Sequence, residues 1–321
     1  MYRKFYKLTR NPFELSPDPY FFCPTPRHNE ALALLNYGVL RRKGFVVVTG
    51  EVGTGKTLLV RCLLDSLTHH NVAFGYIYNP ILSVQSFLEQ VLKDLGLSPA
   101  ARSKSEALSR LNDYLLARSR DDLTTALVVD EAQLLSWELL EEIRLLTNLE
   151  TTQHKLLQIV LAGQPELDRK VDSHQLRQLK QRVGLRCSLL PLDLQQVESY
   201  VHRRLELAGA DEDGNAIFSR QAIEAIYGVS KGIPRLVNTL CENCLMLAFG
   251  LQLPQITPSV VEEVAADFRL ELSAVPSDNG DSLDGPRVGL QFVHPRNREG
   301  LGRSAAALTE PKTVLRGVKP E

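Results

Sequence analysis

The sequence predicts an α/β protein in which helices flank a parallel five-stranded sheet, and a small all-helical domain and a disordered tail follow. Three observations support this fold class. First, short β-branched apolar runs alternate with helical patterns up to about Pro191. Second, only helical patterns follow. Third, from about Ser273 onward the chain is rich in Gly, Pro, Ser and charged residues and has no apolar periodicity. Alternation of strands and helices is typical of parallel sheets, and polar low-complexity segments cannot bury enough apolar surface to fold.

The expected strands are runs short enough to be buried on both faces of a sheet. They cover residues 45–49, 72–78, 126–129 and 156–162, with a fifth at 184–189. Helices are expected between them at residues 56–69, 84–95, 104–119 and 137–149. Strand and helix therefore alternate in the order that a parallel sheet with crossover helices requires.

The purely helical part is expected at residues 194–208, 219–229, 234–249 and 258–270. These patterns give a domain organisation of an N-terminal segment at 1–40, an α/β domain at 41–191, a helical lid domain at 192–270 and a tail at 271–321. A chain of 321 residues with 44% hydrophobic side chains is long enough for two such domains.

Composition and charge exclude several classes of protein. The 37 Lys and Arg residues balance 38 Asp and Glu residues, so no overall field attracts nucleic acid or anionic lipid. No apolar run approaches the roughly 20 residues of a membrane span, and the start of the chain lacks the apolar core of a secretory signal. Five scattered Cys residues do not form a disulfide framework. We therefore expect a cytoplasmic protein.

A phosphate-binding motif stands directly after the first expected strand. Its sequence, GEVGTGKT, fits the pattern GxxxxGK[ST], which predicts a glycine-rich loop whose N–H groups cradle phosphate at a helix N-terminus. Lys56 is expected to reach the β- and γ-phosphates, and Thr57 to offer its hydroxyl to Mg²⁺. The predicted ATP-binding residues of this loop are Gly50, Glu51, Val52, Gly53, Thr54, Gly55, Lys56, Thr57 and Leu58.

Two carboxylates follow the third expected strand, in the sequence ALVVDEAQ. Asp130 is expected to hold Mg²⁺ through water, and Glu131 to orient and polarise the attacking water. Ligands of open parallel sheets bind at the carboxyl ends of the strands, so this pair and the phosphate loop can converge. The alternative is that the two carboxylates cap the helix that begins near Trp137.

Together these motifs resemble the AAA+ ATPases, and within them the ExeA-like group of secretion-associated ATPases, with similarity also to the TniB and TnsC transposition ATPases. The resemblance extends from Tyr6 to about Leu270. It is carried by NPFELSPDPYFF (11–22), GEVGTGKT (50–57), VVDEAQ (128–133), IVLAGQPEL (159–167), LKQRVGLRCSLLPL (179–192) and GIPRLVN (232–238). It implies a P-loop NTPase fold with ATP and Mg²⁺ as ligands.

The resemblance also implies three further site residues. Gln164 occupies the sensor-1 position, the alternative being a simple turn before Pro165. Arg182 matches the arginine finger that reaches the nucleotide of a neighbouring subunit, although Arg177 and Arg186 lie close enough to compete for this role. Arg235 matches sensor 2, which binds nucleotide from the helical lid.

By the same resemblance, the N-terminal segment packs across the adenine side of the site. The favoured function is a homo-oligomeric ATP hydrolase that drives assembly of a secretion, pilus or exopolysaccharide export apparatus through a protein partner, which would also bring it to the inner membrane. The alternatives are a DNA-dependent transposition ATPase, favoured by the basic run around Arg182, and a scaffold gated by ATP binding alone.

Overall fold

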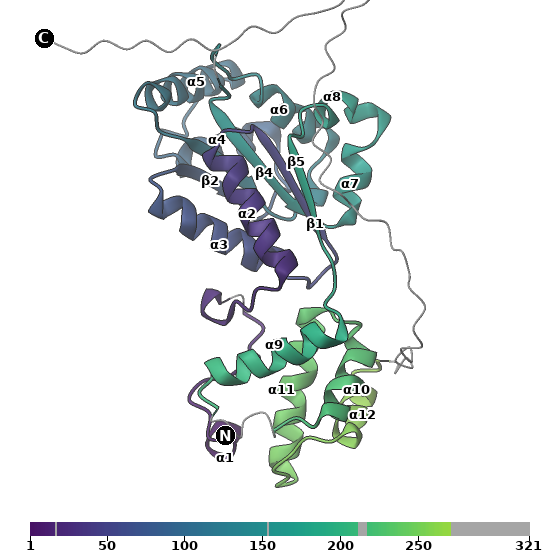
Figure 1. Ribbon diagram of the computed structural model, residues 1–321. Coiled ribbons are helices and arrows are strands. Elements are labelled where there is room, and N and C mark those ends of the chain that lie inside the picture. Colours follow the sequence, from purple (N-terminus) through teal and green to yellow (C-terminus); the bar gives the residue numbers. More distant parts are fainter. Residues whose placement is uncertain (17, 153, 211–216, 271–321) are drawn as a thin grey trace, which may run out of the picture. The chain divides into compact units, whose positions relative to one another are not determined.

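The computed structural model describes residues 1–16, 18–152, 154–210 and 217–270. Its centre is a parallel five-stranded sheet with the order β2-β3-β4-β1-β5 (Figure 1). The strands are β1 (Phe45–Gly50), β2 (Ala73–Ile77), β3 (Thr125–Val129), β4 (Leu157–Gly163) and β5 (Leu185–Leu189). This confirms the predicted fold class, including the fifth strand, which pairs with β1 from Val46↔Leu185 to Gly50↔Leu189.

One face of the sheet is covered by α2 (Pro26–Leu40) and α3 (Lys56–His69), which pack side by side. Alternate strand residues such as Val46 and Val48 face these helices, while Phe45 and Val47 face the opposite layer. This period of two is the geometry of a pleated strand, and it explains why the inner strands β1, β3 and β4 have apolar residues at consecutive positions.

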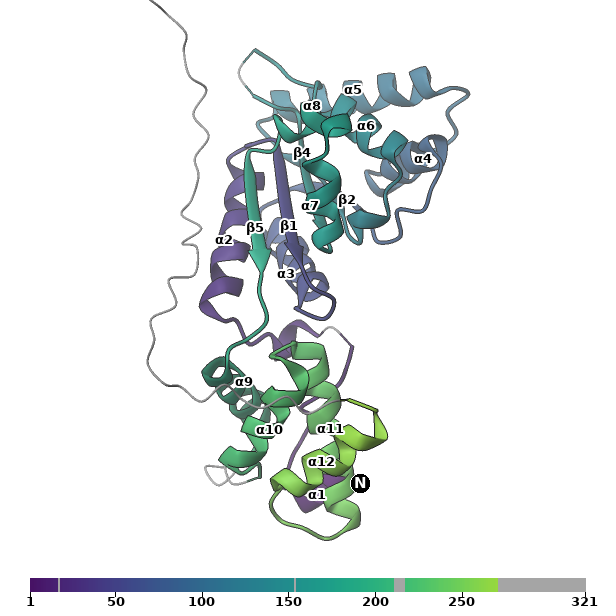
Figure 2. The same ribbon diagram turned by 90° about the vertical axis from the view of Figure 1, so that its right-hand side faces the viewer.

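The opposite face carries α4 (Val84–Asp94), α5 (Lys104–Arg120), α6 (Trp137–Leu146), α7 (Pro165–Val171) and α8 (Arg177–Lys180). Figure 2 shows α2 and α7 on opposite sides of the sheet. Ser83, Ser103 and Ser136 cap the N-termini of α4, α5 and α6 by accepting hydrogen bonds from backbone N–H groups. Short 3₁₀ turns lie at η1 (Pro19–Phe21), η2 (Ala132–Leu134) and η3 (His174–Leu176).

The helical part consists of α9 (Leu194–Leu207), α10 (Arg220–Ser230), α11 (Pro234–Gly250) and α12 (Pro258–Asp267). They enclose a separate apolar core that includes the fully buried Cys241 and Cys244. The start of the chain, with α1 (Tyr2–Phe5), joins the same core. Buried Arg204 of α9 holds the start of the chain against this core, because its Nε donates a hydrogen bond to the carbonyl oxygen of Pro12 (2.5 Å). The Arg204 guanidinium also lies 5.0 Å from the centre of the Phe21 ring.

The main element missing from the sequence-based prediction is α2, a helix of 15 residues within the segment 1–40. Helices α1, α7 and α8 and the 3₁₀ turns were not predicted either, and α6 ends at Leu146 rather than at 149. The expected disordered tail at 271–321 lies outside the described residues. Within the described part of the chain, none of the helices has the length and apolarity to cross a membrane.

Candidate functional site

The phosphate loop, residues 50–57, joins the carboxyl end of β1 to the first turn of α3. Gly53 (φ +84°) and Gly55 (φ +99°) take left-handed backbone conformations that side chains disfavour, so these two glycines are needed for the shape of the loop. Lys56 Nζ donates to the carbonyl oxygens of Gly50 (2.8 Å) and Glu51 (2.8 Å), which holds the ammonium group within the loop. A cradle of this shape fits the phosphates of a nucleotide.

Lys56 contributes a positive charge to this site, and only 6% of its surface is exposed to solvent. Burial lowers the pKa of Lys56, while the negative charges of Glu131, Asp130 and Glu51 act in the opposite direction. The ammonium group therefore lies among carboxylates that it partly neutralises, and it is positioned to exchange its two carbonyl partners for phosphate oxygens.

Arg235, at the start of α11, lies directly against the loop. Its backbone N–H donates to the carbonyl oxygen of Gly53 (3.2 Å), and a Cβ atom at Gly53 would come within 2.8 Å of the Cβ atom of Arg235. Gly53 is thus required both by its backbone angle and by this close approach. The Arg235 side chain is exposed, so its guanidinium is available to a phosphate bound in the loop.

Asp130 follows β3 and is only 3% exposed. Burial raises the pKa of Asp130, and hydrogen bonds from the Glu131 backbone and the Thr57 side chain oppose that rise. A desolvated carboxylate beside a threonine hydroxyl is an oxygen donor set that suits Mg²⁺. Tyr76, which sequence reasoning missed, hydrogen-bonds to Asp130 from the end of β2, and burial raises its pKa to about 12.

Glu131 has a left-handed backbone conformation (φ +50°, ψ +35°), which is uncommon for a residue other than glycine. Its Oε2 atom accepts a hydrogen bond from Gln133 Nε2 (2.6 Å) and a longer one from Gln164 Nε2 (3.4 Å). The alternative that the carboxylates cap the following helix is wrong, because Ser136 provides that cap. Gln164 precedes Pro165 and its side chain makes no cap for α7, so the amide is directed to Glu131 instead.

The N-terminal segment reaches the phosphate loop through His28 of α2. His28 Nε2 lies 3.1 Å from the carbonyl oxygen of Thr54, and Nδ1 lies 2.7 Å from Thr25 Oγ1. Since a carbonyl oxygen can only accept, Nε2 carries the proton, and neutral Nδ1 accepts from the Thr25 hydroxyl. Burial lowers the pKa of His28 from its usual 6.5, so the ring is neutral near pH 7.

A small cavity lies beside His28, with a volume of about 30 Å³, close to that of one water molecule. Its lining combines residues of the N-terminal segment, the phosphate loop, the first turn of α3, and residues in or next to α9 and α11. The lining residues are Phe21, Phe22, Cys23, His28, Thr54, Gly55, Leu58, Leu192, Tyr200 and Pro234.

We expect the stabilising effect of His28 to depend on pH. Because the folded state holds His28 neutral, its contribution is complete above pH 6.5 and declines as pH falls below that value, by up to about 1.4 kcal/mol per pH unit. Urea unfolding of wild type and His28→Gln at pH 7.5 and 5.5 measures this. The stability difference is expected to shrink at pH 5.5, because the folded state disfavours protonation of the buried ring. A difference that grows on acidification would contradict a neutral His28.

The three arginines considered as fingers have different surroundings. Arg186 on β5 forms ion pairs with Asp168 (3.2 Å) and Asp172 (3.0 Å), which fix it to α7 and the residue after it. Arg182 donates from Nη2 to Asn148 Oδ1 (2.8 Å) in an exposed position, and Arg177 Nη1 lies 3.3 Å from His174 Nε2. Arg182 precedes β5, whereas the phosphate loop follows β1. The parallel pairing of β1 and β5 places these points at opposite ends of the sheet.

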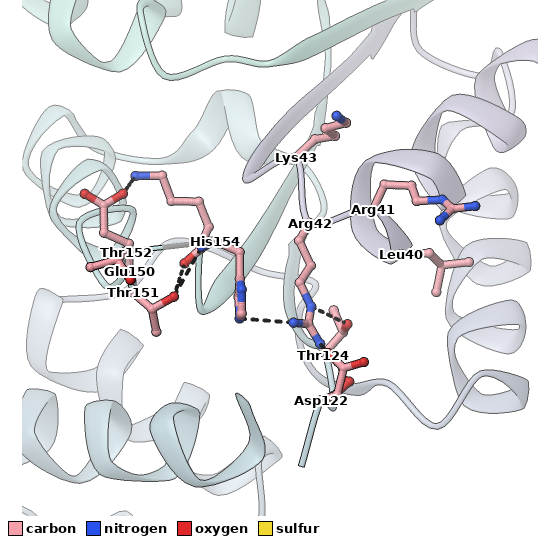
Figure 3. A pocket seen from close by; sticks show the side chains of 11 residues that line it. Leu40, Arg41, Arg42, Lys43, Asp122, Thr124, Glu150, Thr151, Thr152 and His154 are labelled. Carbon is pink, nitrogen blue, oxygen red and sulfur yellow. Dashed lines mark hydrogen bonds and ion pairs between the residues drawn. The ribbon is translucent and has the colours of Figure 1, made fainter. Parts of the chain in front are cut away.

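A wider cavity of about 700 Å³ lies at the amino ends of the strands, away from the phosphate loop (Figure 3). Arg42 contacts Asp122, Thr124 and His154 there, and Lys155 pairs with Glu150. Figure 3 shows the side chains of Arg41 and Lys43 directed away from Arg42. Among the described residues, the charges of Arg42 and Lys155 are therefore already paired with groups that line the same cavity.

Comparisons with known proteins agree with this geometry. Residues 40–171 match the AAA domain family. The chain is also 44% identical over 252 residues to General secretion pathway protein A from Aeromonas hydrophila, an alignment that covers 78% of this chain and 45% of that protein. The chain thus spans less than half the length of this curated relative.

Solved structures with the same fold include the ORC2 protein of Aeropyrum pernix in its ADPNP–ADP complexes. Its TM-score is 0.60 at 14% sequence identity, and the match covers 80% of this chain and 71% of the ORC2 chain. Cdc6p of Pyrobaculum aerophilum has a TM-score of 0.59 and 20% identity over 78% of this chain and 71% of that one. These identities are low enough that the likeness concerns the fold alone. The family match identifies an AAA domain at residues 40–171, and together with the fold and the relative from Aeromonas hydrophila it supports an ExeA-like AAA+ ATPase.

Proposed function

We propose that this chain binds ATP with Mg²⁺, hydrolyses it at an interface between subunits, and couples hydrolysis to assembly or remodelling of a secretion or export apparatus. The observation that carries the catalytic part is the convergence of Lys56, Thr57, Asp130 and Glu131 at the carboxyl ends of β1 and β3. In P-loop hydrolases, side chains of these types bind the phosphates, the Mg²⁺ ion and the attacking water.

In this proposal Lys56 and the N–H groups of the phosphate loop bind the β- and γ-phosphates. Thr57 and Asp130 would hold Mg²⁺, which, when bound, neutralises charge on the phosphate oxygens. Glu131 orients the attacking water and accepts its proton, and Gln164 hydrogen-bonds at the same position. The adenine ring goes to the small cavity beside His28 and widens it, because 30 Å³ holds only a water molecule. Arg235 contacts the γ-phosphate from α11.

Arg182 can serve only another subunit's nucleotide. Five residues of strand separate the end of the sheet where Arg182 lies from the end where the phosphate loop lies, a length of roughly 16 Å. Its contact with Asn148, just beyond α6, keeps the guanidinium near the amino ends of the strands. The proposal therefore requires a homo-oligomer in which one protomer supplies Lys56 and its neighbour supplies Arg182.

For Arg182→Ala we expect ATP affinity within about two-fold of wild type and a fall in turnover of roughly 10³-fold, the loss typical of a removed arginine finger. Mixing Arg182→Ala with Lys56→Ala chains should restore part of the rate, because some interfaces then combine an intact phosphate loop with an intact arginine. Arg220→Ala, whose side chain is 80% exposed on α10, is the matched control and should keep the wild-type rate. If the ATPase rate of the mixture does not exceed the sum of the rates of the two variants measured separately, Arg182 does not act as an arginine finger between subunits.

The biological process is tested by steady-state ATPase rates against protein concentration, with and without duplex DNA, at two salt concentrations. Similarity to General secretion pathway protein A supports a partner that belongs to a secretion or export apparatus. The chain would meet this partner in the cytoplasm, or the partner would bring the chain to the inner membrane. We expect the rate per protomer to rise with protein concentration and to be unaffected by DNA. Strong stimulation by DNA that is lost at high salt would instead support the transposition-type function.

The basic run near Arg182 gives that alternative little support. Asp172 pairs with Lys180 (3.1 Å) and with Arg186, and Asp168 also pairs with Arg186. Cations held by carboxylates on the same chain contribute less to phosphate binding than free ones, because a DNA phosphate must displace their partners.

A further inference from the structure

The catalytic carboxylate is held by a glutamine that follows it by two residues. We infer that Gln133 is a positioning residue for Glu131: its side-chain amide ties Glu131 Oε2 to the end of β4 and so fixes the orientation of the base. This inference rests on the proposed function, in which Glu131 activates water. It concerns a residue that neither the phosphate-loop motif nor the sensor positions include.

The hydrogen bonds of the Gln133 amide define its role. Nε2 donates to Glu131 Oε2 (2.6 Å), and Oε1 accepts from the backbone N–H of Gln164 (3.0 Å). Only this orientation of the amide satisfies both partners, because a carboxylate cannot donate and a backbone N–H cannot accept. One side chain therefore connects the base on the β3 loop to the main chain at the end of β4.

The site is built around this amide. Gln133 is only 9% exposed, which leaves its side chain little freedom to leave the hydrogen bonds. A Cβ atom at Gly163 would stand 2.9 Å from Gln133 Oε1 and 3.2 Å from the Gln133 backbone nitrogen, so the glycine provides the space that the amide occupies. The loop itself is held by Lys170, whose Nζ donates to the carbonyl oxygens of Gln133 (2.5 Å) and Leu135 (2.9 Å).

This arrangement has a chemical consequence for hydrolysis. A free glutamate side chain samples several rotamers, and a general base acts only when it lies within hydrogen-bond reach of its water. Both amide contacts, from Gln133 and Gln164, engage Oε2. Oε1 is then the oxygen that accepts the proton of the water, and Gln133 acts on the rate by keeping it in place.

The first test is Gln133→Met, which keeps the length of the side chain and removes its donor. We expect kcat to fall roughly 10- to 100-fold, since small misplacements of a catalytic group cost about this much. KM and the Kd for a slowly hydrolysed ATP analogue should stay within two-fold of wild type. Gln195→Met, on the exposed side of α9, is the matched control and should keep the wild-type rate. Urea unfolding verifies that both variants fold.

The second test separates an action through Glu131 from a structural effect. In the Glu131→Gln background, adding Gln133→Met should change the residual single-turnover rate by less than two-fold, because the base that Gln133 positions is already absent.

The outcomes are distinguishable. A wild-type kcat in Gln133→Met, or an equal loss of rate in the wild-type and Glu131→Gln backgrounds, overturns the positioning role while the proposed function stands. A wild-type rate in Glu131→Gln overturns the proposed function, and the role of Gln133 falls with it.

Discussion

Replacing Lys56 by alanine is expected to lower the ATPase rate by roughly 10²- to 10³-fold and to weaken ATP binding, because the change removes a preorganised cation from the phosphate site. The ammonium group is buried and already donates to two loop carbonyls, so it reaches the phosphates with little reorganisation. Its loss also leaves the carboxylates of Asp130 and Glu131 without the positive charge that they share. Steady-state turnover and equilibrium binding of ATP measure the two effects separately.

The matched control is Lys93→Ala on the exposed side of α4, which should leave both quantities unchanged. Urea unfolding of Lys56→Ala is needed as well, since removing the ammonium group leaves the carbonyl oxygens of Gly50 and Glu51 without their donor. Full activity in a folded Lys56→Ala protein would contradict the assignment of the phosphate loop.

Replacing Glu131 by glutamine is expected to reduce kcat by roughly 10²- to 10⁴-fold while ATP still binds, since a general base typically contributes that much to the rate. The substitution keeps the size of the side chain but removes the negative charge that accepts a proton from water. One oxygen can still accept from Gln133, so the loop that carries Glu131 should keep its conformation. Single-turnover hydrolysis together with equilibrium ATP binding distinguishes this result from a loss of affinity.

Glu138→Gln, an exposed change in the first turn of α6, is the control for loss of a carboxylate outside the site, and we expect it to retain the wild-type rate. If Glu131→Gln hydrolyses ATP at the wild-type rate, another group activates the water. Retention of ATP with slow turnover, by contrast, would make this variant the suitable form for isolating the assembled oligomer.

The sequence by itself determined the fold class and the position of the glycine-rich loop between β1 and α3. The P-loop contacts are local: Lys56 reaches carbonyls five and six residues before it, and the loop is defined by the strand before and the helix after it. Consecutive apolar residues revealed the buried strands for a similar reason, because both faces of the sheet are covered. Such features require only a motif and a period, and both are visible along the chain.

Helix α2 was missed although the sequence carries local signals for it, because Thr25 caps its N-terminus and Pro26 is its first residue. What the sequence does not show is where the helix packs: its buried residues, such as Leu35 and Val39, lie in the core that it shares with β1 and α3. The link from His28 to the carbonyl oxygen of Thr54 spans 26 residues and exists only because α2 lies on that face of the sheet.

The contact between the two glutamines beside the base was decided by the tertiary structure. Gln133 and Gln164 are 31 residues apart, and they meet because β3 and β4 are adjacent parallel strands. In the same way, the distance between Arg182 and the phosphate loop follows from the parallel pairing of β5 with β1. A motif specifies which groups a site contains, whereas the order of the strands decides which distant side chains reach them.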